Sequence, residues 1–187
     1  MASLVLWFLG GAVIKDFGGG TLASALLVIS FNAIAGVIGF PLGGKISDMV
    51  AHKTNGRRNV LIAMEALLTV FIFVFAAYVM SGGKDMVVQS IILFVSGLIF
   101  FALQAVAHAL TSEIAPVHLR GAAFGMLNLV SEIGAVLSPV ISGAIRDSTG
   151  SWGTSLILDG VLMGISCIML MGVSTKIVNN NKGMRII

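Results

Sequence analysis

Long apolar stretches alternate with short polar segments along most of the chain. A helix needs about 20 predominantly apolar residues to cross the hydrocarbon core of a bilayer. Five stretches reach that length: residues 22–43, 60–80, 86–110, 122–145 and 154–175. A sixth, residues 2–14, is apolar but shorter, and we expect it to be the last part of a helix that begins upstream. The pattern predicts a bundle of six membrane helices, the first of them truncated.

Composition favours a membrane protein over a water-soluble one. Of the 187 residues, 57% are hydrophobic and only 10% are charged, with a mean hydropathy of +1.05. Such a chain has too little polar surface to cover a soluble globule. The net charge of +3 does not indicate a nucleic-acid partner, because the basic residues occupy short segments between apolar spans. We therefore expect an all-α protein in contact with lipid, with residues 1–175 forming the bundle.

The basic residues predict the orientation of the bundle. If the C-terminus is cytoplasmic, eight Lys and Arg residues lie in cytoplasmic segments and three lie outside. Short cytoplasmic loops are enriched in such residues. The cytoplasmic set is Lys45, Lys53, Arg57, Arg58, Arg120, Lys176, Lys182 and Arg185, and the outer set is Lys15, Lys84 and Arg146. The count predicts a multi-pass plasma-membrane protein in which residues 176–187 form a cytoplasmic tail.

Three segments carry a resemblance to a known family. Gly-x-x-x-Asp at residues 44–48, followed by Gly-Arg-Arg at 56–58, resembles the loop signature of the major facilitator superfamily. Residues 113–121 resemble the Glu-x-x-Pro-x-x-x-Arg-Gly segment that precedes the eleventh helix of that family. Residues 122–147 resemble the eleventh helix of its anion:cation symporter branch, whose members carry sugar acids and other organic anions.

This resemblance implies a fold and a function. The chain is similar to helices seven to twelve, the C-terminal half of a twelve-helix transporter that works by alternating access. The implied activity is proton-coupled uptake of a sugar acid or another small organic anion. The alternative is a non-transporting membrane module or truncated remnant that needs a partner half. We expect no enzyme, cofactor or metal site, because the sequence has no His and carboxylate cluster with metal spacing and no nucleophile with a base.

The resemblance also implies a charged latch at the cytoplasmic end. Asp48 is expected to dock on a helix of the missing N-terminal half, where a helix N-terminus attracts a carboxylate. Arg57, Arg58, Glu113 and Arg120 are expected to form a charge network within this half. The alternative is a set of solvated loop charges, since exposed ion pairs contribute little.

Polar residues inside the spans predict where substrate and proton bind, because such residues are costly in a membrane. Glu132, in the middle of its span, is the predicted proton-coupling residue, with a glutamate hydrogen-bonded to a neighbouring helix as the alternative. It shares a small, polar helix face with six residues at spacings of three and four. These are Gly121, Gly125, Asn128, Ala135, Pro139 and Ser142.

A second stripe, whose members recur every four residues, is predicted to face the same cavity: Ser96, Phe100, Gln104 and His108. His108 is predicted to relay protons, with a wet interfacial histidine as the alternative. The residues predicted to bind substrate hydroxyls are Asn32, Gln104, Asn128 and Ser131. For Asn32, a role in helix packing is an equal alternative.

Four further features are expected to be structural. Glu65 should reach back towards Arg58, and Asp159 should lie near the positive end of its helix. Gly39-x-x-x-Gly43 and Gly160-x-x-x-Gly164 should allow close helix packing. No Lys or Arg lies deep in any span, so the missing half would have to neutralise a substrate carboxylate.

Overall fold

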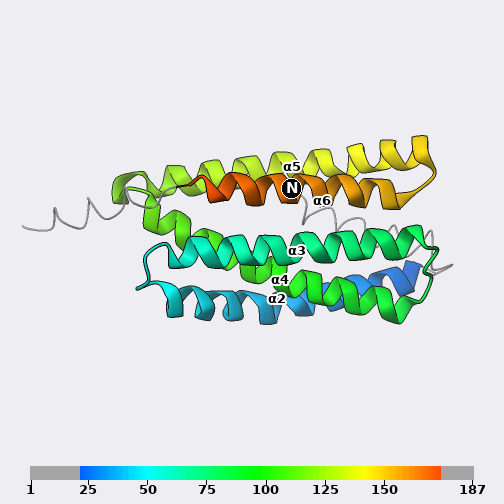
Figure 1. Ribbon diagram of the computed structural model, residues 1–187, viewed down its shortest axis with the longest axis horizontal. Coiled ribbons are helices and arrows are strands. Elements are labelled where there is room, and N and C mark those ends of the chain that lie inside the picture. The colour runs from blue at the N-terminus through cyan, green and yellow to red at the C-terminus, as the bar shows by residue number, and fades with distance from the viewer. Residues whose placement is uncertain (1–21, 174–187) are drawn as a thin grey trace, which may run out of the picture.

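A computed structural model describes residues 22–173, and five long helices make up most of this region (Figure 1). They are α2 (Leu22–Val50), α3 (Gly56–Met80), α4 (Met86–Ile114), α5 (Arg120–Thr149) and α6 (Trp152–Met171), with the 3-10 turn η1 (Val117–Leu119) before α5. Each of the five is long and apolar enough to cross a membrane. Within residues 22–173 there is no strand, so the all-α membrane class is confirmed. The stretches 2–14 and 176–187 lie outside the described residues.

The helices extend beyond the apolar stretches at the end that holds most of the basic residues. There α2 continues past residue 43 to Val50, and α3 begins at Gly56. The segment that reads as one basic loop is therefore mostly helical, and only residues 51–55 link the two helices. Asn55 closes this link with φ of 57°, a left-handed conformation that Asn adopts more readily than most residues.

The helices pack unevenly against one another. α2 packs mainly along α4, and α3 packs mainly along α6. α4 starts beside α2 and crosses the bundle to end near α5 (Figure 1). The largest buried side chains come from α3, α4 and α6, and include Leu68, Ile72, Phe75, Val106 and Leu156. α5 contacts α6 and α4 more lightly, and only Gly134 and Ser142 on it are buried.

Glycine allows α2 and α4 to approach closely. A Cβ atom built on Gly39 would lie 2.7 Å from the carbonyl oxygen of Leu98, and one built on Gly43 would overlap the backbone of Ala102. The predicted role of Gly39-x-x-x-Gly43 in close packing is thus confirmed. In Gly160-x-x-x-Gly164 only the first glycine is closely packed. A Cβ on Gly160 would lie 2.9 Å from Phe73, whereas a Cβ on Gly164 would make an ordinary van der Waals contact with Thr69.

The change Gly43→Ala should destabilise the bundle, because its methyl group would meet backbone rather than a flexible side chain. Overpacking of this kind costs about 1–3 kcal/mol, which for a chain of this size lowers the midpoint of thermal unfolding by roughly 2–4 °C per kcal/mol. The matched control is Gly44→Ala, since a Cβ at Gly44 meets nothing within 4 Å. Circular dichroism of the purified protein in detergent measures both midpoints. Equal midpoints for the two variants would contradict the packing.

Candidate functional site

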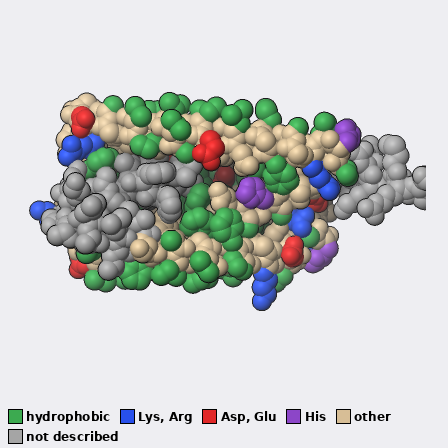
Figure 2. All heavy atoms as spheres, turned by 180° about the vertical axis from the view of Figure 1, so that it is seen from behind, with side chains coloured by type: hydrophobic (Ala, Val, Ile, Leu, Met, Phe, Trp, Pro, Cys, Tyr) green, Lys and Arg blue, Asp and Glu red, His purple; other side chains and the backbone are tan. Residues whose placement is uncertain are grey.

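Charged side chains gather at one end of the bundle, where α2, α3 and α4 meet (Figure 2). Arg57 is central to this group. Its Nη1 lies 3.0 Å from Oε2 of Glu113, and its Nη2 lies 3.6 Å from Oδ1 of Asp48. Its Nε donates to Oγ of Ser47 at 2.9 Å. We call these four residues the charge cluster; through it, one guanidinium group ties the ends of three helices together.

The two ion pairs of the charge cluster differ in strength. The side chains of Arg57 and Glu113 are 18% and 27% exposed, and a hydrogen bond joins them. Asp48 is 82% exposed and stands further from the guanidinium group, so solvent screens its attraction to Arg57. Asp48 thus has a partner within this chain, which the sequence did not predict, while most of its carboxylate stays open.

The predicted charge network is smaller than expected. Arg58 does not join it: its Nε donates to the carbonyl oxygen of Leu170 at 3.3 Å, and its Nη2 donates to that of Met171. These are the last carbonyls of α6, where the helix dipole stabilises a cation. Arg120 is exposed and forms no ion pair with any other described residue. Of the four residues predicted, only Arg57 and Glu113 pair with each other.

The expectation that Glu65 reaches towards Arg58 is wrong. Glu65 is buried between α3 and α6, and its Oε1 accepts a hydrogen bond from Oγ of Ser166 at 3.2 Å. Arg58 lies about two turns away along α3, whereas α6 packs directly on the face that carries Glu65. Glu65 therefore binds the hydroxyl of Ser166 on the neighbouring helix and not the guanidinium group of Arg58 on its own helix.

The stripe predicted on α4 divides into two parts. Ser96 and Phe100 are buried inside the bundle, whereas Gln104 and His108 are only half-buried. The His108 ring meets the ring of Phe124 edge-on, with 5.9 Å between centroids. Within the half-buried part of the stripe, His108 therefore lies where α4 meets α5.

The predicted substrate residues do not all share one surface. Asn32 is buried where α2 crosses α4, so close to Gly97 that a Cβ there would overlap its Oδ1. This placement favours the helix-packing alternative for Asn32. On α5, Asn128 and Glu132 are exposed, and Ser131 is half-buried with its Oγ donating to the carbonyl of Leu127 at 2.9 Å.

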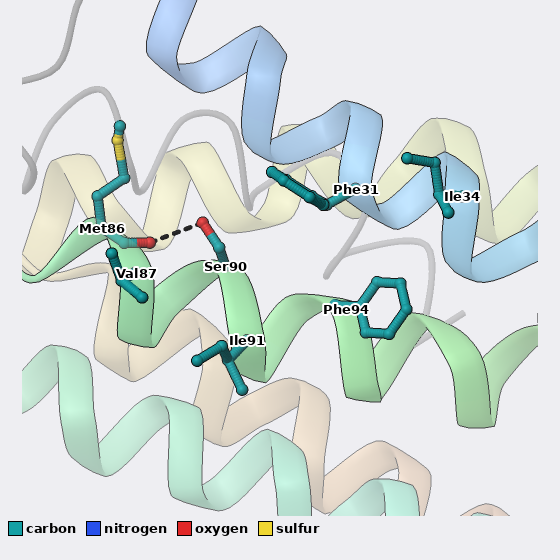
Figure 3. Close-up of a pocket in the computed structure, with 7 residues that line it drawn as sticks. All are labelled: Phe31, Ile34, Met86, Val87, Ser90, Ile91 and Phe94. Carbon is teal, nitrogen blue, oxygen red and sulfur yellow. Dashed lines mark hydrogen bonds between the residues drawn. The ribbon is translucent and has the colours of Figure 1, made fainter.

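A cavity of about 570 Å³ opens between α2 and α4 (Figure 3). Its described lining is almost wholly apolar: Phe31, Ile34, Met86, Val87, Ser90, Ile91 and Phe94. The hydroxyl of Ser90 is already used, because it donates to the carbonyl of Met86 at 2.6 Å. The cavity thus offers little to bind an anion, and none of the predicted site residues is part of its described lining. Across residues 22–173, no three His, Cys, Asp or Glu side chains gather as metal ligands.

Comparisons with known proteins match residues 1–184 to the Major Facilitator Superfamily. The probable galactarate/D-glucarate transporter GudP of Escherichia coli (strain K12) is 32% identical over 82% of this chain and 34% of its own length. The probable sulfoacetate transporter SauU of Cupriavidus necator is 29% identical over 83% and 36%. The hexuronate transporter of Bacillus subtilis (strain 168) is 25% identical over 83% and 37%. The chain thus spans about a third of the length of the curated relatives it matches, and no solved structure gives a significant match.

The two ion pairs of the charge cluster can be ranked by double-mutant cycles. Combining Arg57→Ala with Glu113→Ala should give a coupling energy of about 1 kcal/mol, because that pair is half-buried and hydrogen-bonded. Combining Arg57→Ala with Asp48→Ala should give less than about 0.5 kcal/mol. The coupling energies are obtained from the unfolding midpoints of the unchanged protein, the single variants and the double variants. The midpoints are measured at low and at high salt. A larger coupling for Asp48 than for Glu113 would contradict the geometry.

Proposed function

Because the chain belongs to the major facilitator superfamily, we propose that it is one six-helix half of a twelve-helix secondary transporter for a small organic anion. The observation that carries this proposal is the open surface of α5. Asn128 and Glu132 lie on it near mid-length, exposed although the helix is apolar enough to span a membrane. Contact with lipid is energetically unfavourable for an amide and a carboxylate, so we infer that both side chains face a water-filled cavity or a second bundle. A facing half would enclose such a cavity at the midplane.

Sugar acids are the proposed substrates. The relatives named above are described as transporters of galactarate, glucarate, sulfoacetate and hexuronate. Within the described helices, Lys and Arg lie only towards the ends, so we assign neutralisation of the substrate to the other half. Gln104, Asn128 and Ser131 are assigned to the hydroxyl groups, since amides and hydroxyls both donate and accept hydrogen bonds. Asn32 is left out of this set because α2 and α4 enclose it.

Proton coupling is assigned to Glu132 and His108. Glu132 is an exposed carboxyl group in the middle of a spanning helix, and protonation would remove its charge when the cavity closes. His108 lies on the half-buried flank where α4 meets α5, between the middle of the bundle and the charge cluster. It is therefore placed to pass a proton towards that end.

The end that carries the charge cluster is proposed to face the cytoplasm of a plasma-membrane protein. Among the described residues, five Lys and Arg lie near that end and two near the other. The five are Lys45, Lys53, Arg57, Arg58 and Arg120, and the two are Lys84 and Arg146. Asp48, whose carboxylate is largely open, is then free to dock on the other half when the cytoplasmic side closes.

Uptake by the complete protein in proteoliposomes tests the transport proposal. Galactarate or glucarate should enter the vesicles, and Gln104→Ala and Asn128→Ala should each raise KM by about 5–100-fold, the loss expected for one or two hydrogen bonds. Asn59→Ala is the matched control, because Asn59 is an exposed amide near the start of α3. Unchanged KM values in both cavity variants would remove these residues from the site. No uptake of any sugar acid or sulfonate would remove the transport proposal itself.

Glu132→Gln should separate proton movement from substrate movement. An inward proton gradient should stimulate uptake by the unchanged protein and not by the variant, while substrate exchange across the membrane continues in both. The matched control is Asp147→Asn, an exposed carboxylate near the end of α5 that pairs with Arg146. Gradient-driven uptake that survives in Glu132→Gln would assign coupling to another residue.

A further inference from the structure

The apolar cavity between α2 and α4 has no part in the proposed substrate path. The two helices approach closely where Gly39 of α2 lies against Leu98 of α4. One turn further along both, Gly43 lies against Ala102, so the helices run in the same direction. The cavity of about 570 Å³ opens before this contact, nearer to the start of each helix (Figure 3). We call it the α2–α4 groove.

The α2–α4 groove leaves a large apolar surface open. Phe31 and Ile34 on α2 are 43% and 50% exposed, and they line the groove from one side. Val87 and Ile91 on α4 are 66% and 58% exposed, and they line it from the other. An open apolar surface of this kind marks a place where another apolar segment or lipid packs. The sequence before α2 favours a segment of the chain itself.

An apolar segment precedes α2. Residues 2–14 hold no charged residue, and the link that follows at 15–21 carries Lys15, Asp16 and three glycines. α2 then begins at Leu22. A link of this length is usual between helices that pack side by side in opposite directions. Residues 2–14, which lie outside the described residues, are therefore tied to the end of α2 at which the groove opens.

The length of this segment matches the depth of the α2–α4 groove. As a helix, residues 2–14 would extend for about 18 Å, at a rise of about 1.5 Å per residue. Ile34 is the last residue of α2 in the described lining. From Leu22 to Ile34 the distance along α2 is also about 18 Å. A helix that turns back beside α2 would thus reach the whole of the groove on that helix.

The side chains of the segment suit this surface. Leu4, Trp7 and Phe8 are spaced three and four apart, so they would share one face of a helix. Aromatic side chains bury large apolar areas, and a buried indole N–H needs an acceptor. Ser90 carries the one side-chain oxygen of the described lining. Its hydroxyl donates to the carbonyl of Met86 and can still accept a hydrogen bond.

We propose that residues 2–14 bind in the α2–α4 groove as a helix antiparallel to α2, with Leu4, Trp7 and Phe8 turned into it. The indole N–H of Trp7 then donates to Oγ of Ser90. This inference rests on the six-helix half proposed above, since it gives the sixth helix its place, but it does not rest on transport. α5 is no part of the described lining, so the segment leaves the open face of α5 to the second half.

Disulfide formation in the full chain in membranes tests the contact, in a Cys167→Ala background. Disulfides form only where two Cα atoms come within about 7 Å. Ile91→Cys combined with Trp7→Cys or with Phe8→Cys should cross-link in most chains on oxidation, in at least one of the two pairs. The matched control replaces Ile91→Cys by Val70→Cys. Val70 is 57% exposed, but it lies on α3, which is no part of the described lining, and should give no cross-link.

Tryptophan emission gives a second, independent reading. Trp7 and Trp152 are the two tryptophans of the chain, so Trp152→Phe leaves Trp7 as the only emitter. Trp7 enclosed in the α2–α4 groove should keep its emission in vesicles of brominated phospholipid. Strong quenching there would show that Trp7 faces lipid, which overturns the proposed orientation.

Three cross-linking results would overturn the docking itself. They are no cross-link in either Ile91 pair, an equal cross-link in the Val70 pairs, and a product of twice the mass of the chain, which would place a second copy in the groove. None of these readings depends on uptake. A chain that transports no sugar acid can still show the contact, and a transporting chain can lack it, so the two proposals fail separately. If Trp152→Phe does not fold, the cross-links decide alone.

Discussion

The absence of water from the hydrocarbon interior is the constraint on which this structure depends. Backbone groups there must bond within their own segment, which is why the described chain is almost entirely long helices. Some polar side chains find partners across helix contacts, as Oε1 of Glu65 does with Ser166 and Ser155 does with the carbonyl of Ser142. An exposed carboxyl group in the middle of a span is therefore informative, and Glu132 supports the proposal of a water-filled cavity beside this bundle.

Arg57 and Arg58 hold the helix ends together in different ways. Arg57 pairs with Glu113 on α4 and donates to Ser47 on α2, while Arg58 caps the carbonyls at the end of α6. These two adjacent residues at the start of α3 thus contact the ends of α2, α4 and α6. α5 is fixed by neither, and it packs only lightly on its neighbours. The helix that carries the proposed coupling residue is thus the one least restrained within the described bundle.

The sequence predicted the class of fold, because runs of Val, Ile, Leu and Phe long enough to cross a membrane are rare in water-soluble proteins. It did not predict where the helices end, because hydropathy falls at Lys45 and Arg57 although the helices there continue. Glu65 and Ser166 stand 101 positions apart, so no local pattern links them. Arg58 binds backbone carbonyls, which every residue has, so its partners leave no signature. The six-helix count and the roles of Gln104, Asn128 and Glu132 stay predictions.

The central claim, that one face of α5 lines a water-filled substrate path, is tested most directly by the accessibility of single cysteines. Cys167 is the only cysteine in the chain, so replacing it with Ala gives a clean background. Cysteines at Asn128 and Glu132 should react with a membrane-impermeant thiol reagent in the reconstituted complete protein, and substrate should slow the reaction. Cysteines at Met126 and Val130, exposed on the opposite face of the same helix, should not react. Equal reaction at all four positions, or no reaction at Asn128 and Glu132, would contradict the account.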